Sequence, residues 1–119
     1  MNMTITKEDI RNFASIAGDH NPIHLNGTYA KQHGYTGGIV HGMLIMAKLW
    51  NVLSTEYFFG KETLETYTMT FSAPLYADDV MAIEIGEKKD LSYPFKGFVE
   101  NQLIVKGSLE LQKGCNVTS

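Results

Sequence analysis

The feature that most constrains this chain is a long apolar run from Ile39 to Leu53, interrupted by His41, Lys48 and Asn51. A segment that is hydrophobic almost all round is typical of a helix buried inside a protein. Its fifteen residues fall short of the roughly 20 that a helix needs to cross a bilayer. The run therefore predicts one central helix with the rest of the chain packed around it, and no membrane span.

Short helices are expected before this run. An apolar stripe at helical spacing begins after Thr6, which can cap the helix with Asp9 as its capping-box partner, and Gly18 is a natural stop. Residues 18–26 are rich in turn formers and predict a loop. A second short helix is expected from Thr28, ending at Gly34.

Beyond Gly60 the hydrophobic period changes from helical to alternating. Apolar and polar residues alternate over 67–71 and 81–85, and residues 95–99 and 103–111 read as a hairpin. The predicted fold is α+β, with a curved antiparallel meander of about four strands wrapped around the central helix.

Composition and charge narrow the possible functions. The chain has 119 residues, so we expect one domain spanning 1–119. Its net charge of −3 disfavours a nucleic-acid partner, because phosphate neutralisation needs a basic face. The lone Cys115 cannot form an internal disulfide, and the polar N-terminus does not resemble a signal peptide. A cytoplasmic location is the expectation.

The densest group of chemical side chains is Gly18-Asp19-His20-Asn21-Pro22-Ile23-His24. A bend there can bring the Asp19 carboxylate and the His24 imidazole to one site, where the pair could take and return the proton of a single water molecule. Asn21 could orient the pair. The alternative is a structural turn with a surface histidine, because Asp and Asn are common turn residues.

A second group, Gly37-Gly38-Ile39-Val40-His41-Gly42, stands where the long helix begins. The N–H groups at a helix N-terminus are unpaired and partly positive, and Gly42 would let a thioester carbonyl approach them. The alternative is a packing glycine at position 42 and a capping or core histidine at position 41.

A metal site and common cofactor motifs have little support in the sequence. His20 and His24 with Asp19 have weak metal-ligand spacing, and Pro22 opposes the regular helix that would align the two rings. There is no P-loop, dinucleotide fingerprint or nucleophile elbow. No metal or cofactor is expected.

The two groups together resemble the MaoC-like dehydratases, which include the R-specific enoyl-CoA hydratases. The resemblance rests on residues 13–24, on Ile39-Val40-His41-Gly42-Met43 and on Phe71–Asp79, and spans residues 7–112. It implies a hot-dog fold, homodimers joined edge to edge, and syn hydration of trans-2-enoyl thioesters of CoA or acyl carrier protein without any cofactor. It assigns catalysis to Asp19 and His24, the thioester carbonyl to Gly42, and a supporting role to Asn21. We also expect Asn21 and His41 to contact the substrate.

The sequence departs from the family pattern at three places. Only Met1–Ile5 precede the first helix, where the family has a strand, so the sheet could be one strand short or its edge could be filled otherwise. Trp50 or a neighbour stands where some hydratases have a serine. Its bulk could shorten an acyl pocket lined by Met43, Met46 and Trp50, or alter how Asp19 is held. Asp78-Asp79 replaces the family's Gly-Asp.

Two other functions stay open. A hot-dog thioesterase commonly uses a carboxylate on the central helix, and this helix offers none before Glu56. A non-catalytic acyl-thioester-binding subunit would not need the Asp19–His24 pair. The carrier is also undecided, since Arg11 is the single arginine and lysines such as Lys31 would have to meet any phosphate.

Overall fold

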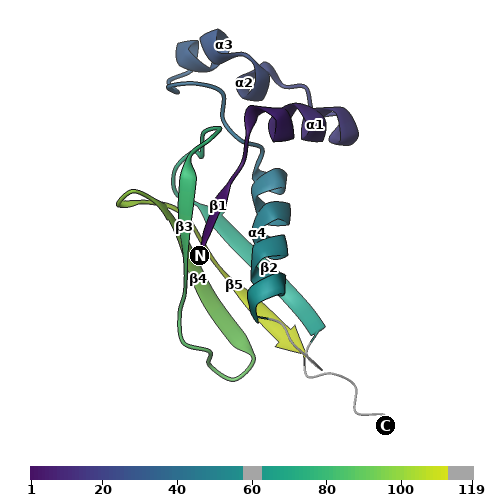
Figure 1. The fold of residues 1–119 in the computed structure, drawn as a ribbon, viewed down its shortest axis with the longest axis vertical. Helices are drawn as coiled ribbons and strands as arrows, with labels where there is room; N and C mark the ends of the chain where they lie inside the picture. Colours follow the sequence, from purple (N-terminus) through teal and green to yellow (C-terminus); the bar gives the residue numbers. More distant parts are fainter. Residues whose placement is uncertain (58–62, 113–119) are drawn as a thin grey trace.

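The computed structural model describes residues 1–57 and 63–112, which form one sheet and four helices (Figure 1). The predicted α+β class is confirmed. The elements in chain order are β1 (Asn2–Thr4), α1 (Lys7–Ala17), α2 (Pro22–Leu25), α3 (Gly27–Gln32), α4 (Gly42–Tyr57), β2 (Thr63–Phe71), β3 (Val80–Ile85), β4 (Ser92–Val99) and β5 (Gln102–Gln112). Cys115 lies outside the described residues.

Helix α1 has the bounds that its cap residues predict. The Asp9 N–H donates to Thr6 Oγ1 at 3.1 Å and the Thr6 N–H donates to Asp9 Oδ2 at 3.0 Å, which completes a capping box. The helix ends at Gly18, whose φ of 71° is the left-handed conformation that glycine adopts readily. The following loop therefore leaves α1 at a fixed angle.

The segment after Gly18 is more helical than expected. Pro22 was expected to prevent a helix, but it occupies the first turn of α2, where its missing N–H costs nothing and its fixed φ suits the helix. Asn21 caps this helix, because its Oδ1 accepts the Ile23 N–H at 3.0 Å. The second expected helix is present as α3, one residue earlier at its start.

The strand order β1-β3-β4-β5-β2 decides one open alternative and corrects one expectation. Strand β1 pairs with β3, so the short segment before the first helix fills this edge and the sheet is not one strand short there. Strands β3, β4 and β5 form an antiparallel meander, but β2 crosses to the far edge and pairs with β5, Met69 lying opposite Gly107. The sheet is therefore not a simple four-strand meander.

The core lies between α4 and one face of the sheet (Figure 1). Leu44, Ile45, Leu49 and Leu53 of α4 are buried in it together with Met81, Ile83, Phe95, Ile104, Val105 and Leu109 of the strands. The opposite side of α4 is exposed at Met43, Ala47, Asn51 and Thr55, four residues apart each time. The expected burial of this helix on every side is therefore wrong for the single chain. None of the helices in residues 1–57 has the length and apolar character needed to span a membrane.

Candidate active site

Helices α1, α2 and α3 lie together at one end of the molecule, beside the N-terminus of α4 (Figure 1). Residues 33–41 connect α3 to α4, and we call this segment the strap. The strap is held on both sides by main-chain hydrogen bonds. The Ile39 N–H donates to the Ile23 carbonyl at 3.0 Å, and the Val40 N–H donates to the Leu75 carbonyl at 2.8 Å. This strap brings the two chemical groups of the sequence, 18–24 and 37–42, to the same place.

Asp19 and His24 face each other across a short gap. His24 Nε2 lies 3.9 Å from Asp19 Oδ2, with the imidazole 12% exposed and the carboxylate 48% exposed. The other ring nitrogen of His24, Nδ1, lies 2.7 Å from the Ile39 carbonyl oxygen. A carbonyl oxygen only accepts, so Nδ1 carries a hydrogen, and Nε2 is the ring nitrogen that faces the carboxylate.

The Asp19 carboxylate is oriented by its own turn. Its Oδ1 accepts the Asn21 N–H at 3.3 Å, which leaves Oδ2 on the histidine side. The Asn21 side chain is used to cap α2, so it holds the loop between Asp19 and His24. Capping therefore accounts for an amide at this position, and Asn21 acts on the pair through the backbone.

His41 is buried behind this pair, with 2% of its side chain exposed. Its Nε2 donates to the Asp19 carbonyl oxygen at 3.1 Å and lies 3.9 Å from Asp19 Oδ2. Its ring stacks on that of His24, with centroids 3.7 Å apart, and Phe13 packs beside it at 4.9 Å. Its Nδ1 is buried and has no hydrogen-bond partner among the described residues. The structure thus places His41 behind the pair with its Nε2 directed at the Asp19 main chain, and its expected contact with a substrate stays a prediction.

The start of α4 offers hydrogen-bond donors next to the histidines. The His41 carbonyl accepts the N–H groups of Leu44 and Ile45. Within the part of the chain that is described, the N–H groups of Gly42 and Met43 have no acceptor. Such unpaired amides at a helix N-terminus suit an oxygen that gains negative charge.

Asp19, His24 and His41 place one ligand atom each within 4.8 Å of one another, which raises the question of a metal. An imidazole binds a metal along the lone pair in its ring plane. The two ring planes here are stacked and only 24° apart, so their lone pairs do not converge on one ion. The His41 Nε2 hydrogen is also directed at the Asp19 carbonyl. In this arrangement the cluster fits proton transfer better than metal binding.

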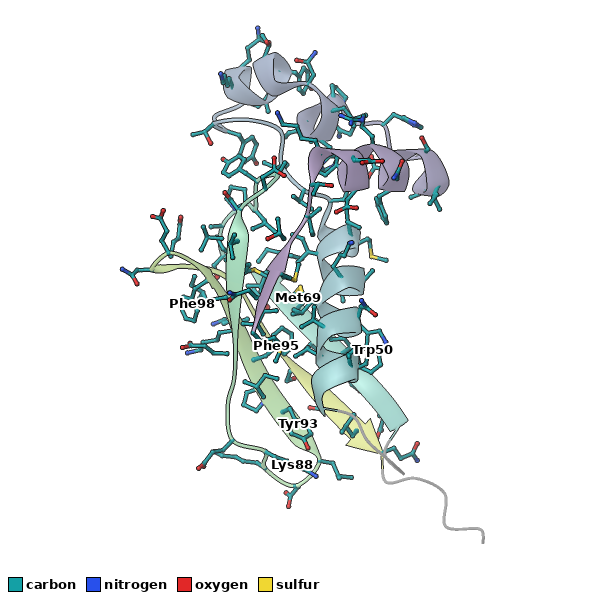
Figure 2. The ribbon with its side chains drawn as sticks, in the orientation of Figure 1. Trp50, Met69, Lys88, Tyr93, Phe95 and Phe98 are labelled. Atoms are coloured by element: carbon teal, nitrogen blue, oxygen red, sulfur yellow. The ribbon has the colours of Figure 1, made fainter. Side chains whose placement is uncertain are left out.

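The three expected acyl-pocket residues follow α4 away from the site. Met43 is 68% exposed, and the Met46 carbonyl accepts the Tyr67 hydroxyl at 2.9 Å. Trp50 lies eight residues after Gly42, about 12 Å along the helix (Figure 2). Its ring is tilted against that of Tyr67. Burial raises the pKa of Tyr67, so its hydroxyl stays protonated. None of the three expected residues lines the cavity of about 620 Å³ that adjoins His24.

Two groups that contact the site histidines were not predicted from the sequence. The Ile39 carbonyl, which fixes the His24 ring, has no side-chain signature at all. Phe13, which packs against His41, was visible only as one member of the apolar stripe of α1. Its position in line with the stripe gave no sign that it would contact a histidine.

A single long helix packed on a curved antiparallel sheet is the arrangement of the hot-dog fold. Solved structures agree with it. The R-hydratase from A. caviae superposes with a TM-score of 0.77 at 22% identity, over 95% of this chain and 91% of that one. The R-hydratase PhaJ1 from Pseudomonas aeruginosa gives 0.77 at 25% identity, over 96% of this chain and 77% of that one.

The family described as "MaoC like domain" matches residues 1–106, and the chain belongs to this family. It is 28% identical over 116 residues to a mitochondrial 3-hydroxyacyl-[acyl-carrier-protein] dehydratase of Arabidopsis thaliana, covering 93% of this chain. It is 27% identical over 110 residues to an (R)-specific enoyl-CoA hydratase of Rhodospirillum rubrum, covering 87% of this chain and 76% of that protein. The chain covers 62% of the length of the Arabidopsis relative. It covers 29% and 52% of the lengths of two bacterial dehydratases that it also matches.

Proposed function

We propose that this chain is a hydro-lyase that reversibly adds water to trans-2-enoyl thioesters and yields R-3-hydroxyacyl thioesters. The observation that carries the proposal is the geometry of Asp19 Oδ2 and His24 Nε2, 3.9 Å apart. A water oxygen about 2.8 Å from both atoms would see them at an angle of about 90°, close to the spread of its own hydrogens and lone pairs. The names of the relatives, dehydratases and enoyl-CoA hydratases, support the same reaction.

The chemistry needs one proton taken and one proton returned. One O–H bond of the held water breaks and its proton passes to the Asp19–His24 pair, while the water oxygen bonds to the β-carbon. The π bond between the α- and β-carbons breaks, and its electrons take up a proton from the pair at the α-carbon, so the pair ends with the protons it started with. Because both additions come from the side where the pair lies, the addition is syn. We assign the proton transfer to the pair as a whole and name neither member alone as acid or base.

The thioester carbonyl is proposed to bind at the start of α4. Charge develops on its oxygen as the α-carbon gains enolate character, and the free N–H groups of Gly42 and Met43 would stabilise that charge. Removing one such donor typically costs a hundredfold or more in rate, which is the scale on which this contact would act.

His41 is proposed as a positioning residue that acts through Asp19 and His24. Its Nε2–H holds the Asp19 main chain, and its ring supports the His24 ring. His41→Leu removes the donor and should lower kcat about tenfold or more with KM unchanged, whereas His41→Gln keeps a donor and should retain most of kcat. Equal kcat values in the two variants, with equal thermal stability, would contradict this role.

The central experiment follows the loss of conjugated enoyl absorbance of crotonyl-CoA on hydration. Asp19→Asn and His24→Ala should each lower kcat/KM by about a hundredfold or more, the usual scale of a positioned acid–base group. Asp90→Asn and His33→Ala, the same kinds of change at exposed positions elsewhere, serve as controls and should keep full activity. Chiral analysis of the product should give the R alcohol.

Other outcomes would redirect the assignment. Near-normal turnover in either Asp19→Asn or His24→Ala would remove the pair from catalysis. Release of free thiol from acyl-CoA without hydration would indicate a thioesterase, and ligand-dependent melting without turnover would indicate a binding subunit. Acyl-CoA and acyl-carrier-protein thioesters are both proposed substrates, and the cytoplasmic location stays a prediction.

We also propose a homodimer joined along β2. This strand lies at one edge of the sheet, next to the exposed side of α4, where Met43 is 68% and Phe71 44% exposed. Burying such side chains against a second copy would be favourable. Met43→Glu should convert the dimer to a monomer in sedimentation experiments, while Val80→Glu near the other edge should not. A wild-type monomer would contradict the proposal.

A further inference from the structure

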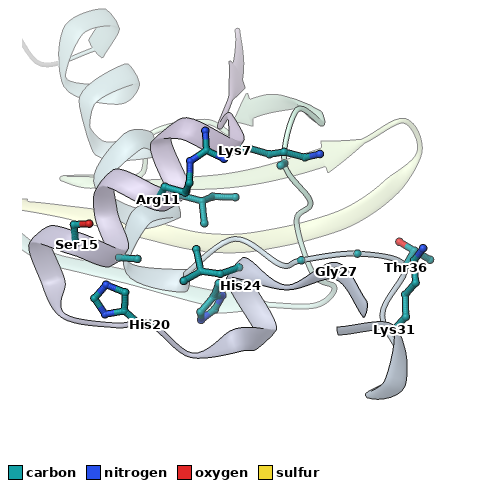
Figure 3. Close-up of a pocket in the computed structure, with 14 residues that line it drawn as sticks. Lys7, Arg11, Ser15, His20, His24, Gly27, Lys31 and Thr36 are labelled. Atoms are coloured by element: carbon teal, nitrogen blue, oxygen red, sulfur yellow. The ribbon is translucent and has the colours of Figure 1, made fainter. Parts of the chain in front are cut away.

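A cavity of about 620 Å³ lies between α1 and α3 and reaches the catalytic pair at His24 (Figure 3). This volume is typical of small-molecule sites. We call it the α1–α3 pocket. Its floor is apolar and includes Ile10 and Ala14 of α1, whereas its rim is polar.

The rim carries an unusual concentration of positive charge. Lys7, Arg11 and Ser15 recur every four residues, which places them on one face of α1. Lys31 faces the pocket from α3, on the other side (Figure 3). The chain has thirteen acidic and ten basic residues, yet no carboxylate from the described part of the chain lines this pocket. Arg11, the only arginine in the sequence, does line it.

These cations are also unpaired. In residues 1–57 and 63–112 none of Lys7, Arg11 and Lys31 takes part in an ion pair, although Lys48 of α4 reaches Asp9 of α1 at 3.7 Å. Three unpaired cations on two sides of one cavity repel one another, and a multiply charged anion between them would relieve that repulsion. Guanidinium and ammonium groups together are typical phosphate ligands.

We propose that the α1–α3 pocket binds the phosphate-bearing arm of the thioester's carrier through Lys7, Arg11 and Lys31. The proposal rests on the proposed hydratase function, because it places the carrier at the cavity that opens beside His24. CoA and the prosthetic group of an acyl carrier protein share one chemistry here, a pantetheine ending in phosphate. The pocket therefore selects thioesters by their carrier, separately from the acyl chain.

The test compares three thioesters of the same acyl group: crotonyl-CoA, crotonyl-phosphopantetheine and crotonyl-pantetheine. The triple variant Lys7→Glu/Arg11→Glu/Lys31→Glu should raise KM for crotonyl-CoA at least tenfold, about the effect of losing one charge-assisted contact. It should leave KM for crotonyl-pantetheine unchanged. All three side chains are exposed, so folding should not suffer, and Lys89→Glu is the control for charge reversal elsewhere.

The crotonyl-phosphopantetheine arm separates the two carriers. A higher KM with this compound as well locates the shared phosphate in the pocket, and a rise confined to crotonyl-CoA locates the nucleotide phosphates there. An equal change for crotonyl-pantetheine, or no change for any substrate, overturns the proposal.

Calorimetric titration with free CoA keeps this result separate from the hydratase assignment. Wild-type protein should bind CoA more weakly as salt rises, because the contacts are ionic, and the triple variant should bind it at least tenfold more weakly. An equal affinity for CoA in wild type and the triple variant overturns the proposed phosphate binding in this pocket, even if hydration is observed. If hydration is absent, the comparison still decides whether the pocket takes phosphate.

Discussion

Gly38 lies against the main chain of His24, and we expect an added methyl group there to disturb catalysis. An alanine Cβ at position 38 would be 2.6 Å from the His24 carbonyl oxygen and 3.2 Å from its carbonyl carbon. Carbon–oxygen contacts normally stay beyond about 3.3 Å. The His24 backbone must therefore shift by roughly 0.7 Å in Gly38→Ala, or the strap carrying Ile39 must move instead.

A shift of this size matters because Asp19 and His24 are proposed to hold one water molecule between them. A misplacement of about 1 Å can cost a hundredfold in rate, so Gly38→Ala should lower kcat/KM for crotonyl-CoA by about tenfold to a hundredfold. That loss corresponds to a barrier about 1.4–2.7 kcal/mol higher. Overpacking should also lower the free energy of unfolding by about 1–3 kcal/mol.

The neighbouring glycine provides the matched control. Nothing lies within 4 Å of a Cβ at Gly37, and neither glycine has a positive φ, so Gly37→Ala makes the same chemical change without the contact. Hydration kinetics and thermal melting of the two variants should differ clearly. If Gly38→Ala matches Gly37→Ala in both measurements, the strap does not hold His24 in place as we infer.

Four further predictions concern the scaffold. Thr6→Ala should lower the free energy of unfolding in urea by about 1 kcal/mol through loss of the α1 cap, and an unchanged midpoint would contradict that. The hydrogen bond from the Thr6 backbone N–H is the largest cause that holds the pKa of Asp9 below its ordinary 3.8. The stability from this contact is therefore complete above pH 3.8 and is lost as the pH falls through the lowered pKa. The melting temperatures of wild type and Asp9→Asn should therefore converge as the pH is lowered. Tyr67→Phe should lower the free energy of unfolding by about 1 kcal/mol, because the Tyr67 hydroxyl donates to a main-chain carbonyl of α4. Gly107→Ala should prevent folding, as measured by circular dichroism, because its Cβ would overlap the Thr68 carbonyl oxygen.

Local signals in the sequence predicted the elements well. Thr6, Asp9 and Gly18 fixed both ends of α1, because caps and stops act within a few residues. The alternating pattern located the strands that the structure calls β2 to β5. The prediction that Pro22 prevents a helix was wrong, because proline breaks a helix in its interior but favours the first turn.

Contacts between distant residues were harder to predict. The pairing of β2 with β5 follows from long-range packing that alternation does not encode. In the site, Asp19 lies in the loop before α2 and His24 lies in α2, and their proximity could be expected from the bend between them. The bond from His41 to the Asp19 carbonyl spans 22 residues and depends on how α4 meets α1, which no local pattern reports.

Every group gathered at the candidate site comes from residues 13–43, before the chain enters its first long strand. Beyond this segment, the Leu75 carbonyl is the main-chain anchor that the strap uses. The reactive geometry therefore comes from one continuous stretch of sequence, which the strands support through this anchor and through their packing against α4. Transplanting this segment into a related scaffold should carry its chemistry along, together with Lys31 but without Lys7 and Arg11 of the proposed carrier pocket.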